Sequence, residues 1–304
     1  MKIVFMGTPD FAVASLKALV ENDCEVVAVI TAPDKPSGRG LVMHETPVKK
    51  YAVSQGIPVL QPEKLKNPDF LEQLRSYQAD LQVVVAFRML PEIVWNMPKI
   101  GTFNLHGSLL PQYRGAAPIN WAVINGDTET GVTTFFIQQE IDTGNIIFVE
   151  KLPILPEDNA GSVHDKLMEL GANLVVKTVR AIEAGNYPQI PQDMSAELKS
   201  APKIFKETCQ IDWNQSAEKI HDFVRGLSPY PAAWTLLNGK SCKIYQTEIG
   251  EIADNDAIEI GNFKTDGKTF LDYRSANKWL KIKELQLEGK KRMGIEEFLR
   301  GFRA

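Results

Sequence analysis

Short apolar runs alternate with helix-like segments along the first part of the chain. Three runs rich in β-branched residues are typical of strands buried on both faces: Ile3–Met6, Val26–Thr31 and Leu81–Ala86. The segments Phe11–Val20 and Pro47–Gln55 lie between them and carry apolar residues at helical spacing. Strands and helices that alternate in this way predict an α/β fold with a doubly wound, mainly parallel sheet.

The same alternation continues beyond residue 100. The longest predicted element is a helix over Ser162–Ala184, in which apolar residues recur at steps of three and four positions. Gly185 follows this helix and would end it. Before the helix, the pattern predicts three strands, Thr102–His106, Val132–Ile137 and Ile146–Leu152, and a shorter helix over Pro118–Asn125.

The pattern changes near residue 186. Residues 186–205 hold three prolines among polar residues without periodicity, so we interpret them as a linker that separates residues 1–185 from residues 206–304. The last part contains short strand-like runs separated by glycines, a pattern typical of a small β-barrel or sandwich. The runs are Ser241–Ile249, Ala257–Phe263, Thr269–Tyr273 and Trp279–Leu287.

Composition narrows the class of protein. The 304 residues are 44% hydrophobic and 24% charged, which is ordinary for a folded globular chain. No apolar run approaches the roughly 18 residues that a membrane span needs, and Ile3–Met6 is too short for a secretory signal. Cys24, Cys209 and Cys242 lie far apart, so we expect neither a disulfide framework nor a zinc site. The expected location is the cytoplasm.

Charge is unevenly distributed between the two parts of the chain. The net charge is −5 over residues 1–205 and +1 over residues 206–304, which together give the −4 of the whole chain. A nucleic-acid-binding domain usually has a larger basic excess, but a local basic stripe is sufficient for binding. Net charge therefore neither indicates nor excludes a nucleic-acid partner.

Three polar residues form the most informative chemical pattern. Asn104 and His106 are two positions apart on a predicted strand, so both side chains project to one side while Leu105 points into the core. An amide donor and an imidazole there suit stabilisation of a negative oxygen, and Asp142 could hold the histidine and accept a proton. The alternative is a strand end with two satisfied polar residues, with Asp142 in a turn before Gly144. The residues alone leave both interpretations open.

The first strand–helix turn argues against a nucleotide cofactor. A dinucleotide-binding fold would carry Gly-x-Gly-x-x-Gly there. Residues 7–12 contain a single glycine, Gly7, and Pro9 has no backbone N–H to donate to a phosphate. A phosphate-binding P-loop is also missing from the sequence. An NAD-dependent oxidoreductase is therefore disfavoured, although a ligand should still lie at the carboxyl ends of the strands.

Several motifs together resemble the folate-dependent formyltransferases. The central motif runs from Asn104 to Ile147 and includes His106–Ile119, Gly131–Thr133 and Asp142–Gly144. Further segments resemble the branch of that family that acts on tRNA: Phe5–Ala12, Ser37–Gly40, Pro47–Lys49, Ile211–Trp213, Pro229–Trp234 and Gly289–Leu299. The resemblance covers nearly the whole chain. It implies a Rossmann-like catalytic domain followed by an OB-like β-barrel that helps to bind tRNA.

The resemblance also implies a reaction. Members of this branch transfer the formyl group of 10-formyltetrahydrofolate to the amino group of methionyl initiator tRNA. Attack of the amine on the formyl carbon creates a negative oxygen, to which Asn104 and a cationic His106 would donate hydrogen bonds. Asp142 would remove the proton from the attacking nitrogen, through water. We expect a monomer that needs no metal.

Two loops are expected to bind the folate. The first directly follows the catalytic strand and comprises Ser108, Leu109, Leu110 and Pro111. The second follows the Leu81–Ala86 strand and comprises Phe87, Arg88, Met89 and Leu90. Many relatives carry an aromatic residue followed by glycine in the second loop. Arg88 departs from that pattern, and it could contact the glutamate tail of the folate or lie in solvent.

The tRNA contacts are expected on basic residues of both domains. Arg39 lies in a glycine-flanked loop that by resemblance meets the acceptor stem. Relatives often follow this loop with lysines, whereas this chain has Leu41 and Val42, so binding would depend more on other basic residues. The expected contacts are Arg39, Lys49, Lys203 and Lys206.

Three rival functions remain at this stage. The first keeps the folate but uses a sugar nucleotide or water as acceptor, and the C-terminal part and the Arg39 loop argue against it. The second is the dinucleotide-dependent oxidoreductase disfavoured above. The third is a non-catalytic RNA-binding protein with the same fold, against which Asn104, His106 and Asp142 argue.

Overall fold

The structure of the chain is a computed structural model that describes residues 1–37, 42–195, 197–253 and 258–302. Arg39 lies outside these residues. The chain folds into two compact units. Unit 1 consists of residues 1–115, 131–152 and 164–200, and unit 2 of residues 116–130, 153–163 and 201–304.

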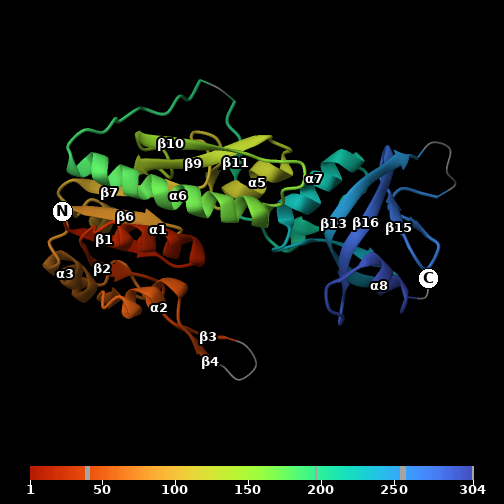
Figure 1. Cartoon of the computed structure of the whole chain (residues 1–304), viewed down its shortest axis with the longest axis horizontal. Coiled ribbons are helices and arrows are strands. Elements are labelled where there is room, and N and C mark those ends of the chain that lie inside the picture. Colours follow the sequence, from red (N-terminus) through yellow and green to blue (C-terminus); the bar gives the residue numbers. More distant parts are fainter. Residues whose placement is uncertain (38–41, 196, 254–257, 303–304) are drawn as a thin grey trace. The chain divides into compact units, whose positions relative to one another are not determined.

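Unit 1 is built on a seven-stranded sheet (Figure 1). The strand order is β10-β9-β7-β6-β1-β2-β5; the last five strands are parallel, and β9 runs antiparallel to β7. The doubly wound, mainly parallel sheet is thus confirmed. The strands are β1 (Ile3–Gly7), β2 (Val26–Ile30), β5 (Val59–Leu60), β6 (Leu81–Val85), β7 (Gly101–His106), β9 (Glu129–Phe136) and β10 (Ile146–Pro153).

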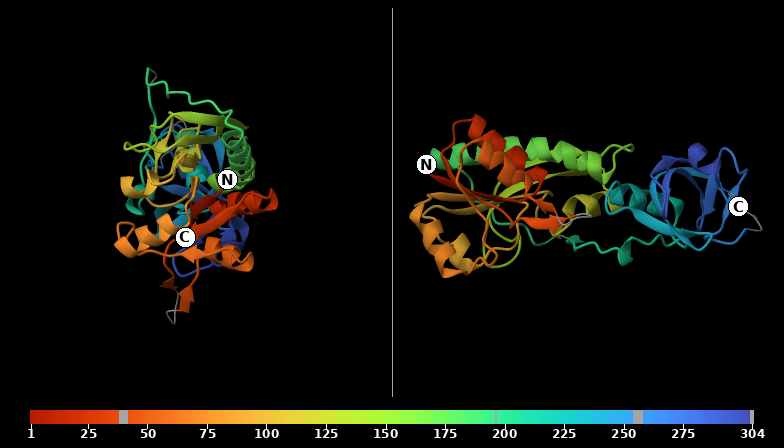
Figure 2. Two further views of the ribbon diagram at one scale, coloured as in Figure 1. Left: turned by 90° about the vertical axis from the view of Figure 1, so that its left-hand side faces the viewer. Right: turned by 90° about the horizontal axis from the view of Figure 1, so that it is seen from below.

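Helices cover both faces of this sheet (Figure 2). On one face α6 packs so closely on β7 that a Cβ at Gly171 would lie 2.7 Å from Cδ2 of Leu105. On the other face, apolar side chains of α3 and α4 share a core with Val4 and Met6 of β1. The helices are α1 (Asp10–Glu21), α2 (Pro47–Ser54), α3 (Pro68–Ser76), α4 (Glu92–Trp95) and α6 (Ala160–Glu183).

The predicted helices α1, α2 and α6 are confirmed to within two residues at each end. The sequence pattern missed α3 and α4. A start signal was nevertheless present for α3, because Asn67 Oδ1 accepts the backbone N–H of Asp69 at 2.9 Å and Pro68 opens the helix. The pattern also missed the hairpin of β3 (Lys35–Ser37) and β4 (Val42–His44) and the two-residue strands β8 (Arg114–Gly115) and β11 (Ser200–Ala201).

Unit 2 is a domain of antiparallel strands with helices packed against it, as expected for the C-terminal part of the chain. The main strand order is β12-β13-β16-β15-β14, and β17 pairs with β16. In its core Trp213 stacks on Tyr273 with 4.5 Å between ring centroids. The strands are β12 (Ala233–Leu237), β13 (Lys240–Ile252), β14 (Phe263–Thr265), β15 (Leu271–Arg274), β16 (Lys278–Leu287) and β17 (Met293–Gly294). The helices are α5 (Pro118–Ile124), α7 (Ala217–Leu227), α8 (Ile295–Leu299) and the 3-10 helix η1 (Glu207–Cys209).

One predicted strand of unit 2 is wrong. The run Ala257–Phe263 was expected to be extended, but residues 258–262 form a turn, and Ala257 lies outside the described residues. The backbone N–H of Asn262 donates to the carbonyl of Glu259, and Gly261 has a φ of +85°. A left-handed glycine in a closed turn prevents this run from joining a ladder.

Residues 116–130 belong to unit 2 because α5 packs tightly on α7. A Cβ at Gly226 would lie 2.7 Å from the backbone nitrogen of Ile124, and the side-chain amide of Asn120 donates to the carbonyl of Gly226 at 2.8 Å. Sequence periodicity identified the helix but gave no sign of its partner. Within the described ranges, no helix is long and apolar enough to cross a membrane.

Candidate active site

Strand β7 places Asn104 and His106 on the same face of the sheet. Leu105 between them is buried against α6 on the opposite face, as the alternation predicted. Across the ladder to β9, Asn104 is opposite Phe135 and His106 is opposite Thr133. Val84 of β6, in the core formed with α3 and α4, pairs with Asn104 on the other side. The two polar side chains therefore lie on the face that carries α3 and α4.

The two ring nitrogens of His106 have different surroundings. Nε2 lies 2.8 Å from the carbonyl oxygen of Tyr113, and Nδ1 lies 3.8 Å from Oδ2 of Asp142. Because a carbonyl can only accept, Nε2 must carry a hydrogen, and Nδ1 is the nitrogen that can gain or lose a proton. A separation of 3.8 Å is too long for a hydrogen bond, so Nδ1 and the carboxylate are close without being joined. Both side chains are largely buried, at 7% and 13% exposure.

The loop after β9 holds Asp142 in a tight conformation. Asp142 has a φ of +55°, and its Oδ2 accepts the backbone N–H of Gly115 at 3.0 Å. Two residues later the chain returns along β9 so closely that a Cβ at Gly144 would lie 1.6 Å from the carbonyl oxygen of Phe136. Glycine is therefore required there, which accounts physically for the sequence Asp-Thr-Gly.

Asn104 differs from the other two residues in having no fixed partner. Its side chain is half-buried, and its amide makes no hydrogen bond to any residue that the structure describes. The structure thus brings His106 and Asp142 together and leaves a donor uncommitted on the same strand face. An imidazole, a carboxylate and a free amide in this arrangement can stabilise a developing negative oxygen and move a proton.

The loop after β7 is held by Thr133 of β9. The Thr133 hydroxyl donates to the carbonyl of Ser108 at 2.7 Å and accepts the backbone N–H of Leu110 at 3.2 Å. Ser108 in turn donates from Oγ to the carbonyl of Gln112 at 2.6 Å, so its side chain is committed within the chain. Gly131 leaves room for this loop, because a Cβ there would lie 2.4 Å from Cδ2 of Leu109.

Thr133 belongs to the Gly131–Thr133 motif, but the sequence pattern assigns it no role. Its side chain is fully buried on β9, the strand that pairs with β7. A buried threonine must satisfy its hydroxyl, and the nearest open backbone groups are those of the adjacent loop. That combination is the signal by which Thr133 could have been recognised. Pro111, the last residue of the loop, is half-buried.

The second predicted folate loop follows β6 and is anchored by Arg88. The Arg88 guanidinium donates to the carbonyl of Glu63 at 2.9 Å and to the carbonyl of Pro62, and it lies 5.6 Å from the ring centroid of Phe87. The side chain thus ties two loops together. Met89 is 72% exposed, whereas Leu90 is buried in the core with α3 and α4.

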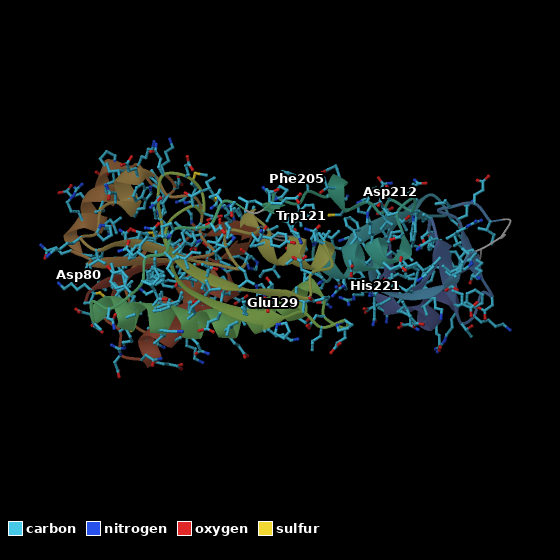
Figure 3. The ribbon with its side chains drawn as sticks, turned by 90° about the horizontal axis from the view of Figure 1, so that it is seen from above. Asp80, Trp121, Glu129, Phe205, Asp212 and His221 are labelled. Carbon is cyan, nitrogen blue, oxygen red and sulfur yellow. The ribbon has the colours of Figure 1, made fainter. Side chains whose placement is uncertain are left out.

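The basic residues expected to contact tRNA have unequal surroundings. The Lys49 ammonium pairs with Asp34 and, at 2.9 Å, with Glu45; these contacts raise the pKa of Lys49 and lower that of Asp34. In unit 2, Lys203 and Lys206 are exposed. The Lys203 ammonium lies 5.4 Å from the ring centroid of Phe205, which is labelled in Figure 3. Both lysines line a hollow that also includes Asn120, Ile204, Tyr230 and Pro231.

Both parts of the chain match known protein families. Residues 1–179 match the family described as formyl transferase, and residues 203–303 match the formyl transferase C-terminal domain. The chain belongs to the formyl transferase family. Unit 1 contains most of the residues that match the formyl transferase family, and the antiparallel strands of unit 2 lie in the matched C-terminal domain.

Several relatives within the family are similar over nearly their whole length. A methionyl-tRNA formyltransferase of Parabacteroides distasonis is 60% identical, with 100% of this chain and 96% of the relative covered. A methionyl-tRNA formyltransferase of Bacteroides fragilis is 56% identical, with 99% of this chain and 95% of the relative covered.

Solved structures of formyltransferases share the fold. WlaRD, a sugar 3N-formyl transferase studied with dTDP and 5-N-formyl-THF, has a TM-score of 0.68 at 21% identity, over 96% of this chain and 99% of its own. HypX from Aquifex aeolicus in complex with tetrahydrofolic acid has a TM-score of 0.66 at 19% identity, over 99% of this chain and 48% of its own. At these identities the likeness shows the fold alone.

Proposed function

We propose that this chain transfers the formyl group of 10-formyltetrahydrofolate to the amino group of methionyl initiator tRNA. The observation that carries the proposal is the cluster of His106, Asp142 and the uncommitted Asn104 amide, in a chain whose relatives over its whole length are methionyl-tRNA formyltransferases. The cluster supports the reaction class, and the relatives support the choice of acceptor.

The proposed roles follow from the hydrogen bonds of each group. The methionine nitrogen bonds to the formyl carbon, and the bond from that carbon to the folate nitrogen breaks. The free amide of Asn104 donates to the formyl oxygen as it becomes negative. His106 donates from Nδ1, because its Nε2 is tied to Tyr113. Asp142, held by the N–H of Gly115, takes the proton of the attacking nitrogen, which finally reaches the leaving nitrogen of the folate.

The two loops at the carboxyl ends of β6 and β7 would hold the folate. The fit rests on the shape of the first loop, which Thr133 fixes before any ligand arrives. Because the Ser108 hydroxyl is committed, Ser108–Pro111 would present backbone groups and apolar side chains to a flat ring system. Phe87–Leu90 would form the second wall, with Arg88 anchoring that wall to Pro62 and Glu63. The folate supplies the activated formyl carbon.

The acceptor would be held by basic residues: Arg39, Lys49, Lys203 and Lys206. In this proposal residues 1–185 perform the transfer, residues 186–205 link the domains, and residues 206–304 help to bind tRNA. We further propose that the protein acts as a cytoplasmic monomer without a metal. Among the described residues no group of three or more His, Cys, Asp or Glu side chains is placed to hold a metal ion.

The decisive experiment is an assay of formyl transfer with the purified chain, 10-formyltetrahydrofolate and methionyl initiator tRNA. The expected product is N-formylmethionyl-tRNA, formed from the initiator in preference to methionyl elongator tRNA. Amino sugars linked to a nucleotide serve as competing acceptors in parallel reactions. Formylation of such a sugar with none of the tRNA would overturn the proposed acceptor while leaving the reaction class intact.

A further inference from the structure

Gln192 joins the two loops that surround the carboxylate of Asp142. The segment after α6 returns along β10, where the backbone N–H and carbonyl of Ile190 pair with those of Ile146 at 2.9 and 2.8 Å. Two residues further on, the half-buried Gln192 side chain reaches inward. All the residues concerned belong to unit 1.

The amide of Gln192 uses its whole hydrogen-bonding capacity in this position. Nε2 donates to the carbonyl of Asp142 at 2.8 Å and to the carbonyl of Gly144 at 2.9 Å. Oε1 accepts from Nε of Arg114 at 3.2 Å and from Nη2 of the same residue at 2.5 Å. A glutamine amide offers two donors and two acceptor sites, so each is occupied.

Both partners of Gln192 determine where the carboxylate lies. The carbonyls of Asp142 and Gly144 belong to the tight loop that presents the carboxylate. The backbone of this loop has a φ of +55° at Asp142, a conformation that needs support from its surroundings. Arg114 precedes Gly115, whose N–H is the donor to Asp142 Oδ2. Gln192 therefore fixes the loop that carries the carboxylate and the loop that holds it.

The four hydrogen bonds of Gln192 require an amide on a side chain of this length. A glutamate at position 192 would keep the bonds from Arg114 but lose both donors to the Asp142 loop and add a second negative charge beside it. An alanine would lose all four bonds and leave the Asp142 and Gly144 carbonyls without these donors.

We propose that Gln192 is a positioning residue that sets the distance between the Asp142 carboxylate and the His106 imidazole. It touches none of the reacting atoms and acts through Asp142. The inference rests on the proposed formyl transfer, since it assigns Gln192 a part in that reaction. It also gives the segment 186–205 a catalytic contribution besides its connecting role.

The test compares the full-length wild-type chain with Gln192→Ala, Gln192→Glu and the control Gln189→Ala. Gln189 is an exposed glutamine of the same segment. For each protein, kcat, both KM values, the pH profile of kcat and the midpoint of thermal unfolding are measured. Gln192→Ala is expected to lower kcat roughly 10- to 100-fold, because small displacements of catalytic groups have effects of that size. Both KM values should change by less than about threefold.

The pH profile of kcat for Gln192→Glu is a measurement that a purely structural role of Gln192 would leave unchanged. The added carboxylate favours the protonated form of its neighbour, so the acid limb of the kcat profile should shift to higher pH. Gln189→Ala should leave kcat and the profile unchanged.

Two results would overturn the inference. One is a folded Gln192→Ala variant with wild-type kcat. The other is a Gln192→Glu variant with an unshifted pH profile, which also decides the matter if the alanine variant does not fold. If the wild-type chain transfers no formyl group, the proposed function is wrong and the inference falls with it.

Discussion

At the scale of single residues, the proposed chemistry depends on side chains that are free and side chains that are committed. Asn104 keeps its amide free among the described residues, whereas His106 commits Nε2 to the backbone and keeps Nδ1 available. The free amide of Asn104 can respond to charge that develops on a substrate. The imidazole of His106 is oriented in advance by its bond to the backbone, which lowers the reorganisation needed during reaction.

Removal of either group should reduce turnover. Asn104→Ala and His106→Ala are each expected to lower kcat by about a hundredfold or more, because one oxyanion donor is commonly worth that much. The assay is steady-state formyl transfer, with circular dichroism to check folding. His164→Ala is the matched control, since that histidine is half-buried on α6, where Nδ1 lies 3.0 Å from Asp165 and the ring centroid lies 5.1 Å from that of Phe11. Near-normal turnover by a folded Asn104→Ala variant would falsify its role as a donor.

Thr133 allows loop positioning to be separated from stability. Thr133→Val removes both bonds to the Ser108–Pro111 loop and should raise KM for the folate about tenfold, since an unsatisfied buried group costs about 1–3 kcal/mol. The control is Thr134→Val, because the neighbouring buried Thr134 bonds to Thr178 and Phe148. It should lower the unfolding midpoint and leave KM unchanged. Equal changes of KM in the two variants would contradict the assignment.

Sequence patterns identified Asn104, His106 and Asp142 as candidates, because their types and spacing already suggest a chemistry. The same patterns gave Arg88 two possible environments, contact with the folate tail or solvent. In the structure Arg88 is exposed to solvent, and its guanidinium also donates to the backbone carbonyls of Pro62 and Glu63, which the patterns did not predict. The missing information was tertiary: these carbonyls lie on another loop, about 25 positions earlier in the chain.

At the scale of elements, periodicity predicted what is long and regular. The helix α6 is 24 residues long, and its apolar repeat is unambiguous. The helix α4 has four residues, and the strand β5 has two; neither is long enough for its apolar pattern to repeat. The partner of α5 could not be predicted either, since the tight contact between Gly226 and Ile124 joins residues about 100 positions apart. Local patterns specify an element but not what it packs against.

The C-terminal sheet contains a carboxylate that opposes folding at neutral pH. Asp272 on β15 is buried, and its Oδ1 has no hydrogen-bond partner among the described residues. Burial raises the pKa of Asp272, and nearby Lys264 and Lys281 offset this only in part. A carboxyl with a raised folded-state pKa costs stability once the pH rises above the unfolded-state value. Asp272→Asn should therefore raise the unfolding midpoint at pH 7, on the order of a few degrees.

The pH dependence supplies the check. The gain from Asp272→Asn should shrink as the pH falls toward the unfolded-state pKa, where the wild-type carboxyl becomes neutral in both states. Asp266 in the preceding turn is the opposite case: bonds from Thr269 lower the pKa of Asp266, so Asp266→Asn should destabilise the protein at pH 7. Thermal unfolding from pH 3 to pH 8 measures both. A gain that persists unchanged at pH 3 would show that ionisation of Asp272 is not its cause.

At the scale of the whole molecule, a net charge of −4 has to be reconciled with binding of a polyanion. Attraction must then come from local groups whose charge is not already compensated. Lys281 and Lys283 pair with Glu248, and Arg292 pairs with Glu284. Lys203 and Lys206 are exposed, and among the described residues no carboxylate lies within 4.0 Å of either ammonium. These two lysines are therefore the strongest candidates for contacts with phosphate.

Salt dependence distinguishes compensated from uncompensated lysines. Each phosphate that a lysine neutralises adds about 0.7–0.9 to the slope of log K against log salt concentration. Lys203→Ala and Lys206→Ala should each reduce the slope for methionyl initiator tRNA by about one. Lys49→Ala should reduce it less, because Asp34 and Glu45 already compensate the Lys49 charge. Lys177→Ala, at a lysine paired with Glu150, is the control. A wild-type slope near zero would mean that no phosphate is neutralised, and tRNA could not be the acceptor.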